Sequence, residues 1–172
     1  MCGIVGLYLK NADMQPELGR LFRPMLSEMT SRGPDSAGVA IYRDPVADGL
    51  TKFSLAHDDP SFGWQGIGDA LGRDLGCEAG MRPVATHCIM TTDAAEADVR
   101  AWLRDNRRDV RLVGSGRSVE IFKEVGLPDD VYDRFGLDQA AGTHMIGHTR
   151  MATESAVTTA GSHPFATGAD LC

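Results

Sequence analysis

The sequence predicts a mixed α+β fold, and three observations lead to this prediction. Apolar runs rich in Ile, Val and Leu, such as residues 2–9, are typical of buried strands. Residues 16–30 instead repeat their apolar positions every three or four residues, which is typical of an amphipathic helix. The 172 residues include 42% hydrophobic amino acids and no internal repeat, so we expect one globular domain.

Turn and breaker residues separate the elements expected in the N-terminal part. Gly33 and Pro34 end the helix, and residues 38–42 return to strand character. Turn signals between residues 44 and 49 predict a hairpin that leads into a further strand at residues 50–55.

The middle of the chain, approximately residues 81–137, has a different pattern. Its expected elements are a strand at residues 84–90, a helix at 94–107, a strand at 110–113, a glycine turn at 114–116 and helices at 118–125 and 129–135. We interpret this stretch as an α/β insertion packed on the main sheet. A last core strand is expected at residues 145–152.

Charge and hydrophobicity limit the classes of partner. The chain has 17 Lys and Arg against 24 Asp and Glu, a net charge of -7, whereas nucleic-acid binding needs a basic face. No apolar stretch reaches the length of a membrane span, and the N-terminus lacks the pattern of a signal peptide. We therefore expect a cytoplasmic protein with neither a nucleic-acid nor a membrane partner.

The four cysteines form no CxxC pattern, so Cys77, Cys88 and Cys172 are expected to be ordinary thiols. Cys2 differs because it directly follows the initiator residue. Removal of Met1 would give Cys2 both a thiol and a free α-amine, and that amine titrates close enough to neutral pH to accept the thiol proton. One residue then supplies nucleophile and base, whereas a retained Met1 would turn the amine into an amide.

Three motifs give this position a context: MCGIVG at residues 1–6, RGPDSAG at 32–38 and GHTRMAT at 147–153, followed by His-Pro-Phe at 163–165. In this order they resemble the class II, N-terminal-cysteine glutamine amidotransferases over the whole chain. The resemblance implies the N-terminal nucleophile hydrolase fold, an αββα sandwich of two antiparallel sheets. The long insertion is most similar to small glutamate-synthase-like subunits, including those of N-methylglutamate synthase systems.

The resemblance also implies roles for individual residues. Cys2 is the expected nucleophile, and Arg150 is expected to bind the α-carboxylate of glutamine, because a guanidinium fork can bind a carboxylate in a bidentate manner. The alternative for such an arginine is a solvated or structural salt bridge, and the GHTRMAT motif favours the substrate role. Thr153 and His163 match positions that line the glutamine pocket, although His163 could equally be a structural histidine that holds the loop around Pro164.

The second motif supplies supporting residues. Arg32, followed by Gly33, resembles the arginine near the nucleophile, where a positive charge favours the thiolate. Asp35 and Ser36 are expected to fix the turn through local backbone bonds.

No metal or other cofactor is expected. His144 and His148 have ligand spacing only on a helix, whereas their segment has strand character. The Gly-Ser-Gly sequence at 114–116 lacks the rest of a phosphate-binding pattern, so we interpret it as a structural turn.

In the resembled family an Asn-Gly pair that forms the oxyanion hole and an acidic ligand of the glutamine amine follow the His-Pro-Phe segment. This chain has no Asn-Gly pair, and its asparagines are Asn11 and Asn106. We therefore expect residues 1–172 to be the N-terminal part of one domain, truncated at the C-terminus. One oxyanion donor contributes on the order of 10² to 10³ in rate, so such a fragment is expected to be nearly inactive alone.

The predicted function is hydrolysis of the glutamine side-chain amide through a Cys2 thioester, with ammonia passed to partner synthase subunits. Two alternatives remain open. One is a non-catalytic structural or regulatory subunit of a glutamate-synthase-like complex. The other is an N-terminal nucleophile hydrolase that acts on a different amide.

Overall fold

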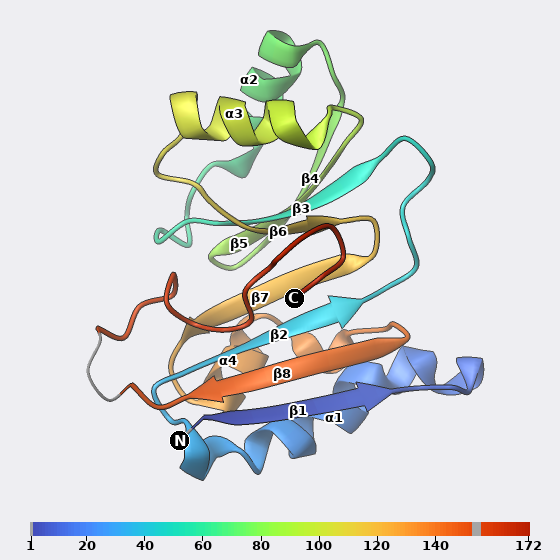
Figure 1. Ribbon diagram of the computed structural model, residues 1–172, viewed down its shortest axis with the longest axis vertical. Coiled ribbons are helices and arrows are strands. Elements are labelled where there is room, and N and C mark those ends of the chain that lie inside the picture. Colours follow the sequence, from blue (N-terminus) through green and yellow to red (C-terminus); the bar gives the residue numbers. More distant parts are fainter. Residues whose placement is uncertain (1, 153–155) are drawn as a thin grey trace. The chain divides into compact units, whose positions relative to one another are not determined.

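The computed structural model describes residues 2–152 and 156–172 (Figure 1). Within these ranges the fold is mixed α+β, with two four-stranded antiparallel sheets and four α-helices. The chain divides into two compact units, which are Met1–Asp44 with Ile121–Phe165 and Pro45–Glu120 with Ala166–Cys172.

The sheet of the first unit has the strand order β1-β8-β2-β7. Its strands are β1 (Gly3–Tyr8), β2 (Ser36–Tyr42), β7 (Val119–Val125) and β8 (His144–Arg150). Strand β8 pairs antiparallel with β1 on one side and with β2 on the other. The start of β1 and the end of β8 therefore meet at one end of the sheet, where Gly3 lies opposite Thr149.

Helix α1 (Leu18–Ser27) covers one face of this sheet, between the short 3-10 helices Ala12–Glu17 and Thr30–Arg32. Phe22 and Leu26 are buried against Gly147 of β8, where an added Cβ would come within 2.9 and 2.8 Å of their side chains. The absence of a side chain at Gly147 thus lets helix and sheet approach closely.

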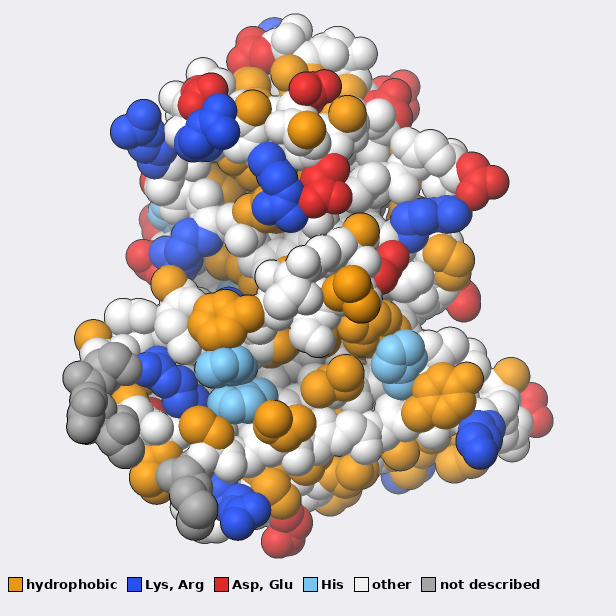
Figure 2. All heavy atoms as spheres, in the orientation of Figure 1, with side chains coloured by type: hydrophobic (Ala, Val, Ile, Leu, Met, Phe, Trp, Pro, Cys, Tyr) orange, Lys and Arg blue, Asp and Glu red, His pale blue; other side chains and the backbone are white. Residues whose placement is uncertain are grey.

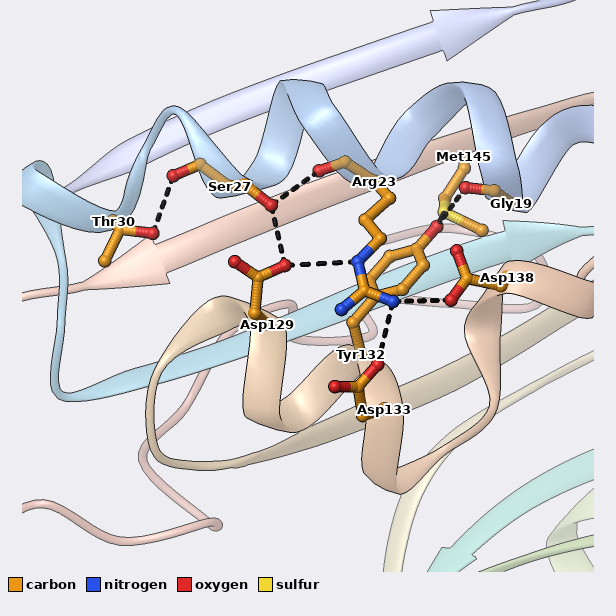
Figure 3. A network of polar contacts seen from close by, with 9 residues as sticks. All are labelled: Gly19, Arg23, Ser27, Thr30, Asp129, Tyr132, Asp133, Asp138 and Met145. Atoms are coloured by element: carbon orange, nitrogen blue, oxygen red, sulfur yellow. Dashed lines mark hydrogen bonds and ion pairs between the residues drawn. The ribbon is translucent and has the colours of Figure 1, made fainter.

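Helix α4 (Pro128–Arg134) and the 3-10 helix Leu137–Gln139 are fastened to α1 by the network around Arg23 (Figure 3). The Arg23 guanidinium contacts Asp129 at 3.2 Å, Asp133 at 2.8 Å and Asp138 at 2.5 Å. Beside it, the buried Tyr132 hydroxyl donates to the carbonyl oxygen of Gly19 at 2.6 Å. These contacts hold the helical layer of the first unit together.

The sheet of the second unit has the strand order β4-β5-β3-β6. Its strands are β3 (Thr51–Ala56), β4 (Ala79–Val84), β5 (His87–Thr92) and β6 (Arg111–Gly116), and its helices are α2 (Trp64–Leu75) and α3 (Glu96–Asn106). One buried core joins sheet and helices, and it includes Phe53, Trp64, Leu71, Met90 and Trp102.

The end of the chain is anchored in this second unit. The Asp170 carboxylate accepts backbone N–H groups of Arg117, Ser118 and Val119 at 2.8 to 2.9 Å. Gly116 makes this possible because an added Cβ would lie 2.5 Å from the Asp170 carboxyl carbon.

Most of the strands and helices expected from the sequence are confirmed. Those found near their expected places are β1, α1, β2, β3, β5, α3, β6, α4 and β8. Three predictions are wrong. Residues 118–125 form strand β7 and not a helix, residues 114–116 continue β6 and do not turn, and β2 and β3 lie in different sheets, so no hairpin joins them.

The sequence pattern also missed helix α2, and the proposed insertion at residues 81–137 stays a prediction. None of the helices in the described ranges is long and apolar enough to cross a membrane.

Candidate functional site

Alternation along β8 sorts its side chains onto the two faces of the first sheet. Gly147 lies against α1, and the Thr149 hydroxyl donates to the carbonyl oxygen of Met29 at 3.1 Å. His148 and Arg150 therefore belong to the opposite face, away from α1. This face and this end of the sheet carry the candidate site.

The strand register places Cys2 at the same end. Gly3 pairs with Thr149, so Cys2 directly precedes the first pair, at the level of Arg150. An added Cβ at Gly3 would lie 2.9 Å from Met29 Cβ and from Thr149 Oγ1, so the start of β1 packs tightly. The Cys2 thiol is exposed on this fixed strand.

The second motif wraps around the end of β8. An added Cβ at Gly33 would lie 2.5 Å from the backbone nitrogen of Arg150, so only glycine fits without a shift. The N–H of Asp35 donates to the Arg150 carbonyl at 3.1 Å, and its carboxylate accepts the N–H of Ala152 at 2.7 Å. These bonds agree with the structural role expected for Asp35. Arg32 is exposed at the end of its 3-10 helix.

The segment before and through the His-Pro-Phe sequence closes the site from another side. An added Cβ at Gly161 would lie 3.0 Å from Arg150 Nη1, so this segment passes beside the guanidinium. The His163 ring stacks on the His148 ring with centroids 4.2 Å apart, and Phe165 meets His163 edge-on at 4.5 Å. Two histidine rings lie against each other on the face drawn in Figure 2.

Burial decides the charge of these rings. Desolvation, followed by the charges of His163 and Arg150, lowers the pKa of His148 to about 4. Desolvation, followed by Lys123 and Arg150, also lowers the pKa of His163. Both imidazoles are therefore neutral at pH 7, and the half-buried Arg150 brings a full positive charge to this face.

Three buried polar atoms on this face have no hydrogen-bond partner among the residues that the structure describes: Ser36 Oγ, His148 Nδ1 and His163 Nδ1. Ser36 lies opposite Arg150 in the β2–β8 register, and its hydroxyl does not make the local backbone bond that the sequence led us to expect. Buried polar atoms are rarely left unpaired, and these three lie on the face of the first sheet that also carries Arg150.

The other thiols differ from Cys2. Burial raises the pKa of Cys88 to about 11, which keeps it protonated and unreactive at neutral pH. Cys77 is half-buried, and Cys172 is exposed as Cys2 is but lies in the second unit. Within the described ranges, no group of three His, Cys, Asp or Glu side chains is arranged to hold a metal ion.

The structure thus brings Cys2, Arg150 and His163 to one end of one sheet face. Thr153 lies outside the described residues, and the roles of all these residues stay predictions. The sequence reasoning missed Ser36 and His148 as members of the site. The period-2 alternation of a strand would have placed His148 on the same face as Arg150.

Comparison with known proteins supplies independent information. No family model matches the chain. The glutamine amidotransferase-like protein GlxB of Rhizobium meliloti (strain 1021) is 50% identical over 173 residues, covering 100% of this chain and 57% of that protein. A putative glutamine amidotransferase of Methanothermobacter thermautotrophicus is 30% identical over 173 residues, covering 96% of this chain and 56% of that protein.

The chain therefore spans slightly more than half the length of these curated relatives. Both relatives carry glutamine amidotransferase names, and the chain is similar to them over 100% and 96% of its length.

Proposed function

We propose that this chain carries the nucleophile and the substrate clamp of a class II glutamine amidotransferase. The Cys2 sulfur attacks the side-chain amide carbon of glutamine, and the Cys2 α-amine takes the thiol proton and returns it to the leaving nitrogen. The C–N bond breaks, ammonia leaves and a γ-glutamyl thioester remains. Water, deprotonated by the same amine, then cleaves the thioester to glutamate and free Cys2.

One observation carries the proposal: all three motifs and the His-Pro-Phe segment converge on the end of β8. Gly3 and Gly33 pack directly on Thr149 and Arg150, while Gly161 passes beside the Arg150 guanidinium. Cys2 and Arg150 therefore share one end of one sheet, as a substrate bound at both its amide and its α-carboxylate requires.

Arg150 is the proposed ligand of the α-carboxylate, and the unpaired atoms around it suit the remaining polar groups of an amino acid. We assign His163 to the wall of this pocket and keep Thr153 there on the motif alone. Arg32, next to Gly33, is proposed to favour the thiolate. The names of the two relatives agree with glutamine as substrate.

The wider assignment follows from the same reasoning. Each unit pairs one antiparallel sheet with helices, which is compatible with the αββα sandwich of N-terminal nucleophile hydrolases. We propose that the ammonia passes to synthase subunits of a glutamate-synthase-like complex, without a cofactor in this chain.

A glutamine-analogue diazoketone tests the nucleophile against the two alternatives. It should label Cys2 in the complete protein and leave Cys77 and Cys88 unmodified, and Cys2→Ser should abolish both labelling and ammonia release. Glutamine turnover that survives Cys2→Ser would rule out the mechanism. Absence of any turnover or labelling in the wild type would favour a structural subunit, and turnover of another amide alone would favour the broader hydrolase.

Arg150→Lys tests substrate recognition separately from thiol reactivity, because it keeps the charge but loses the fork. A charge-assisted hydrogen bond contributes about 1.5 to 3 kcal/mol, so glutamine kcat/KM should fall roughly 10-fold to 100-fold. Iodoacetamide, which lacks an α-carboxylate, should alkylate Cys2 at an unchanged rate. Arg20→Lys, on the exposed side of α1, is the matched control and should change neither rate.

A parallel loss of turnover and alkylation in Arg150→Lys would show that Arg150 shapes the fold or the thiol. The clamp assignment would then be wrong.

A further inference from the structure

Lys123 of β7 is a buried lysine on the site face of the first unit. Only 5% of its surface is exposed. Its ammonium donates to the carbonyl oxygen of Ser162 at 2.7 Å and to that of Pro164 at 3.3 Å, and it lies 4.4 Å from the centre of the Phe165 ring. A buried ammonium is costly without such partners, so these contacts tie the lysine and the loop to each other.

The two acceptor carbonyls flank His163, so Lys123 holds the chain immediately before and after that residue. Gly38 of β2 permits this arrangement. An added Cβ there would lie 2.6 Å from Lys123 Cβ and would collide with the His163 carbonyl oxygen. The His163 backbone therefore packs directly against the sheet at β2 and β7.

The fixed position of the His163 backbone also affects the surroundings of Arg150. With its backbone held, His163 stacks on His148, and the same segment carries Gly161 past the Arg150 guanidinium. The segment 161–165 thus forms one wall around the unpaired atoms of the site, and Lys123 is the buried charged group that fastens it.

We propose that Lys123 is a positioning residue of the glutamine pocket: its ammonium clamps the segment 162–165 so that His163 forms the wall beside His148 and Arg150. It acts on substrate affinity and not on the reactivity of Cys2. This inference rests on the proposed function, because the pocket it shapes is the glutamine pocket.

Lys123→Met tests the clamp in the complete protein, since it keeps the aliphatic stem and removes the donor. Loss of the two bonds to carbonyls should raise the glutamine KM about 10-fold or more with kcat changed less than about threefold. Amide hydrogen exchange of residues 161–165 should accelerate, while iodoacetamide alkylation of Cys2 stays unchanged.

Lys123→Arg should recover most of the lost affinity, because a guanidinium can also donate to two carbonyls and stack on Phe165. The matched control is Lys52→Met in the second unit, where the other buried lysine pairs with Glu120 at 3.4 Å. It should leave the glutamine KM unchanged. If Lys123→Met does not fold, Phe165→Leu at the exposed side of the clamp should still raise KM about threefold.

An unchanged KM with faster exchange at 161–165 would overturn the proposal, since the clamp would then not serve the pocket. Unchanged hydrogen exchange at residues 161–165 in Lys123→Met would also overturn the proposal, because it would show that Lys123 does not hold this segment. The proposed function fails on a different result, which is glutamine turnover that survives Cys2→Ser. That result would not change what hydrogen exchange shows about the Lys123 contacts.

Discussion

Glycines at the site end of the first sheet and glycines at and within helix α2 of the second unit have different surroundings. In the first unit, Gly33 and Gly38 lie where backbone from another segment occupies the space of a side chain. In the second unit, Gly63 and Gly66 face open space, and Gly68 is approached by the side chain of Met81. A backbone atom cannot move aside for an added side chain without shifting its whole segment. A flexible methionine side chain can move aside by changing its rotamer.

Buried polar groups of the two units can be compared in the same way. In the second unit Lys52 and Arg82 both pair with the buried Glu120, at 3.4 and 2.6 Å. On the site face of the first unit, Ser36, His148 and His163 each keep a buried polar atom without a partner among the described residues. Trp64 Nε1 in the second unit also lacks a partner among the described residues, so the feature specific to the site face is that three such atoms share it with Arg150.

Leu71→Ala should have the largest effect on stability, because Leu71 is fully buried in the core of the second unit. Truncation of a buried leucine costs about 2 to 5 kcal/mol. Both tryptophans of the chain, Trp64 and Trp102, lie in that core, so fluorescence-monitored unfolding reports on it. Glutamine KM of the folded variant should stay within about twofold, and a larger change would break the contrast between the units.

Gly33→Ala should lower the free energy of unfolding less than Leu71→Ala does, but it should lower glutamine kcat/KM more. Its backbone is extended, with φ of -161°, so the cost is purely the collision with Thr149 and Arg150. Overpacking of this kind costs about 1 to 3 kcal/mol, and the displaced end of β8 should lower glutamine kcat/KM at least 10-fold. Gly63→Ala, which meets open space, is the control. Normal glutamine kinetics in Gly33→Ala would show that the close approach does not position Arg150.

These contrasts also explain which parts of the molecule the sequence could predict. Strands β1 and β8 and helix α1 follow from apolar periodicity, and the ends of β1 and β8 follow from motifs whose glycines mark close approaches. The same signal misled at residues 114–116, where Gly116 makes room for Asp170 inside a strand and does not mark a turn.

The local sequence pattern predicted neither strand β7 nor helix α2, and the reason differs between the two. Six of the seven residues of β7 are buried, but three of those six are charged, so the sequence shows neither a continuous apolar run nor a regular alternation. Its apolar residues at positions 119, 122 and 125 recur at helical spacing instead. Helix α2 contains three glycines, Gly66, Gly68 and Gly72, which lower helix propensity. The hairpin prediction failed because it assumed that sequential strands pair, and β2 and β3 lie in different sheets.

For the site, the motifs predicted Cys2, Arg150 and His163, which the fold brings to one end of a sheet. Lys123 could not be found in this way. Its partners are backbone carbonyls about 40 residues away, and no side-chain pattern encodes them. Contacts of that kind depend on the folded path of the chain alone.

Acidification should destabilise the first unit through its histidines. The pKa of His148 falls from 6.5 to about 4 on folding, so between these values the unfolded chain binds the proton that the folded chain excludes. Stability should therefore rise with pH across this window and level off above about 6.5, by at most about 1.4 kcal/mol per pH unit for this residue. His148→Gln should flatten the slope, measured by hydrogen exchange in β8. An unchanged slope would assign it to other groups.

The smallest effect, and the one of opposite sign, is expected for Gly66→Ala. Gly66 is exposed in the first turn of α2, its φ is not positive, and an added Cβ meets nothing within 4 Å. Alanine restricts the unfolded chain and suits the helix, so the variant should gain about 0.5 to 1 kcal/mol in tryptophan-monitored unfolding. Gly68→Ala in the same helix is the matched comparison, because its Cβ would lie 2.9 Å from Met81 Cγ. It should gain less or lose stability, depending on how far the methionine can move. Equal gains at both positions would show that Met81 yields freely, whereas a loss at Gly66 would mean that glycine is needed there for a reason other than packing.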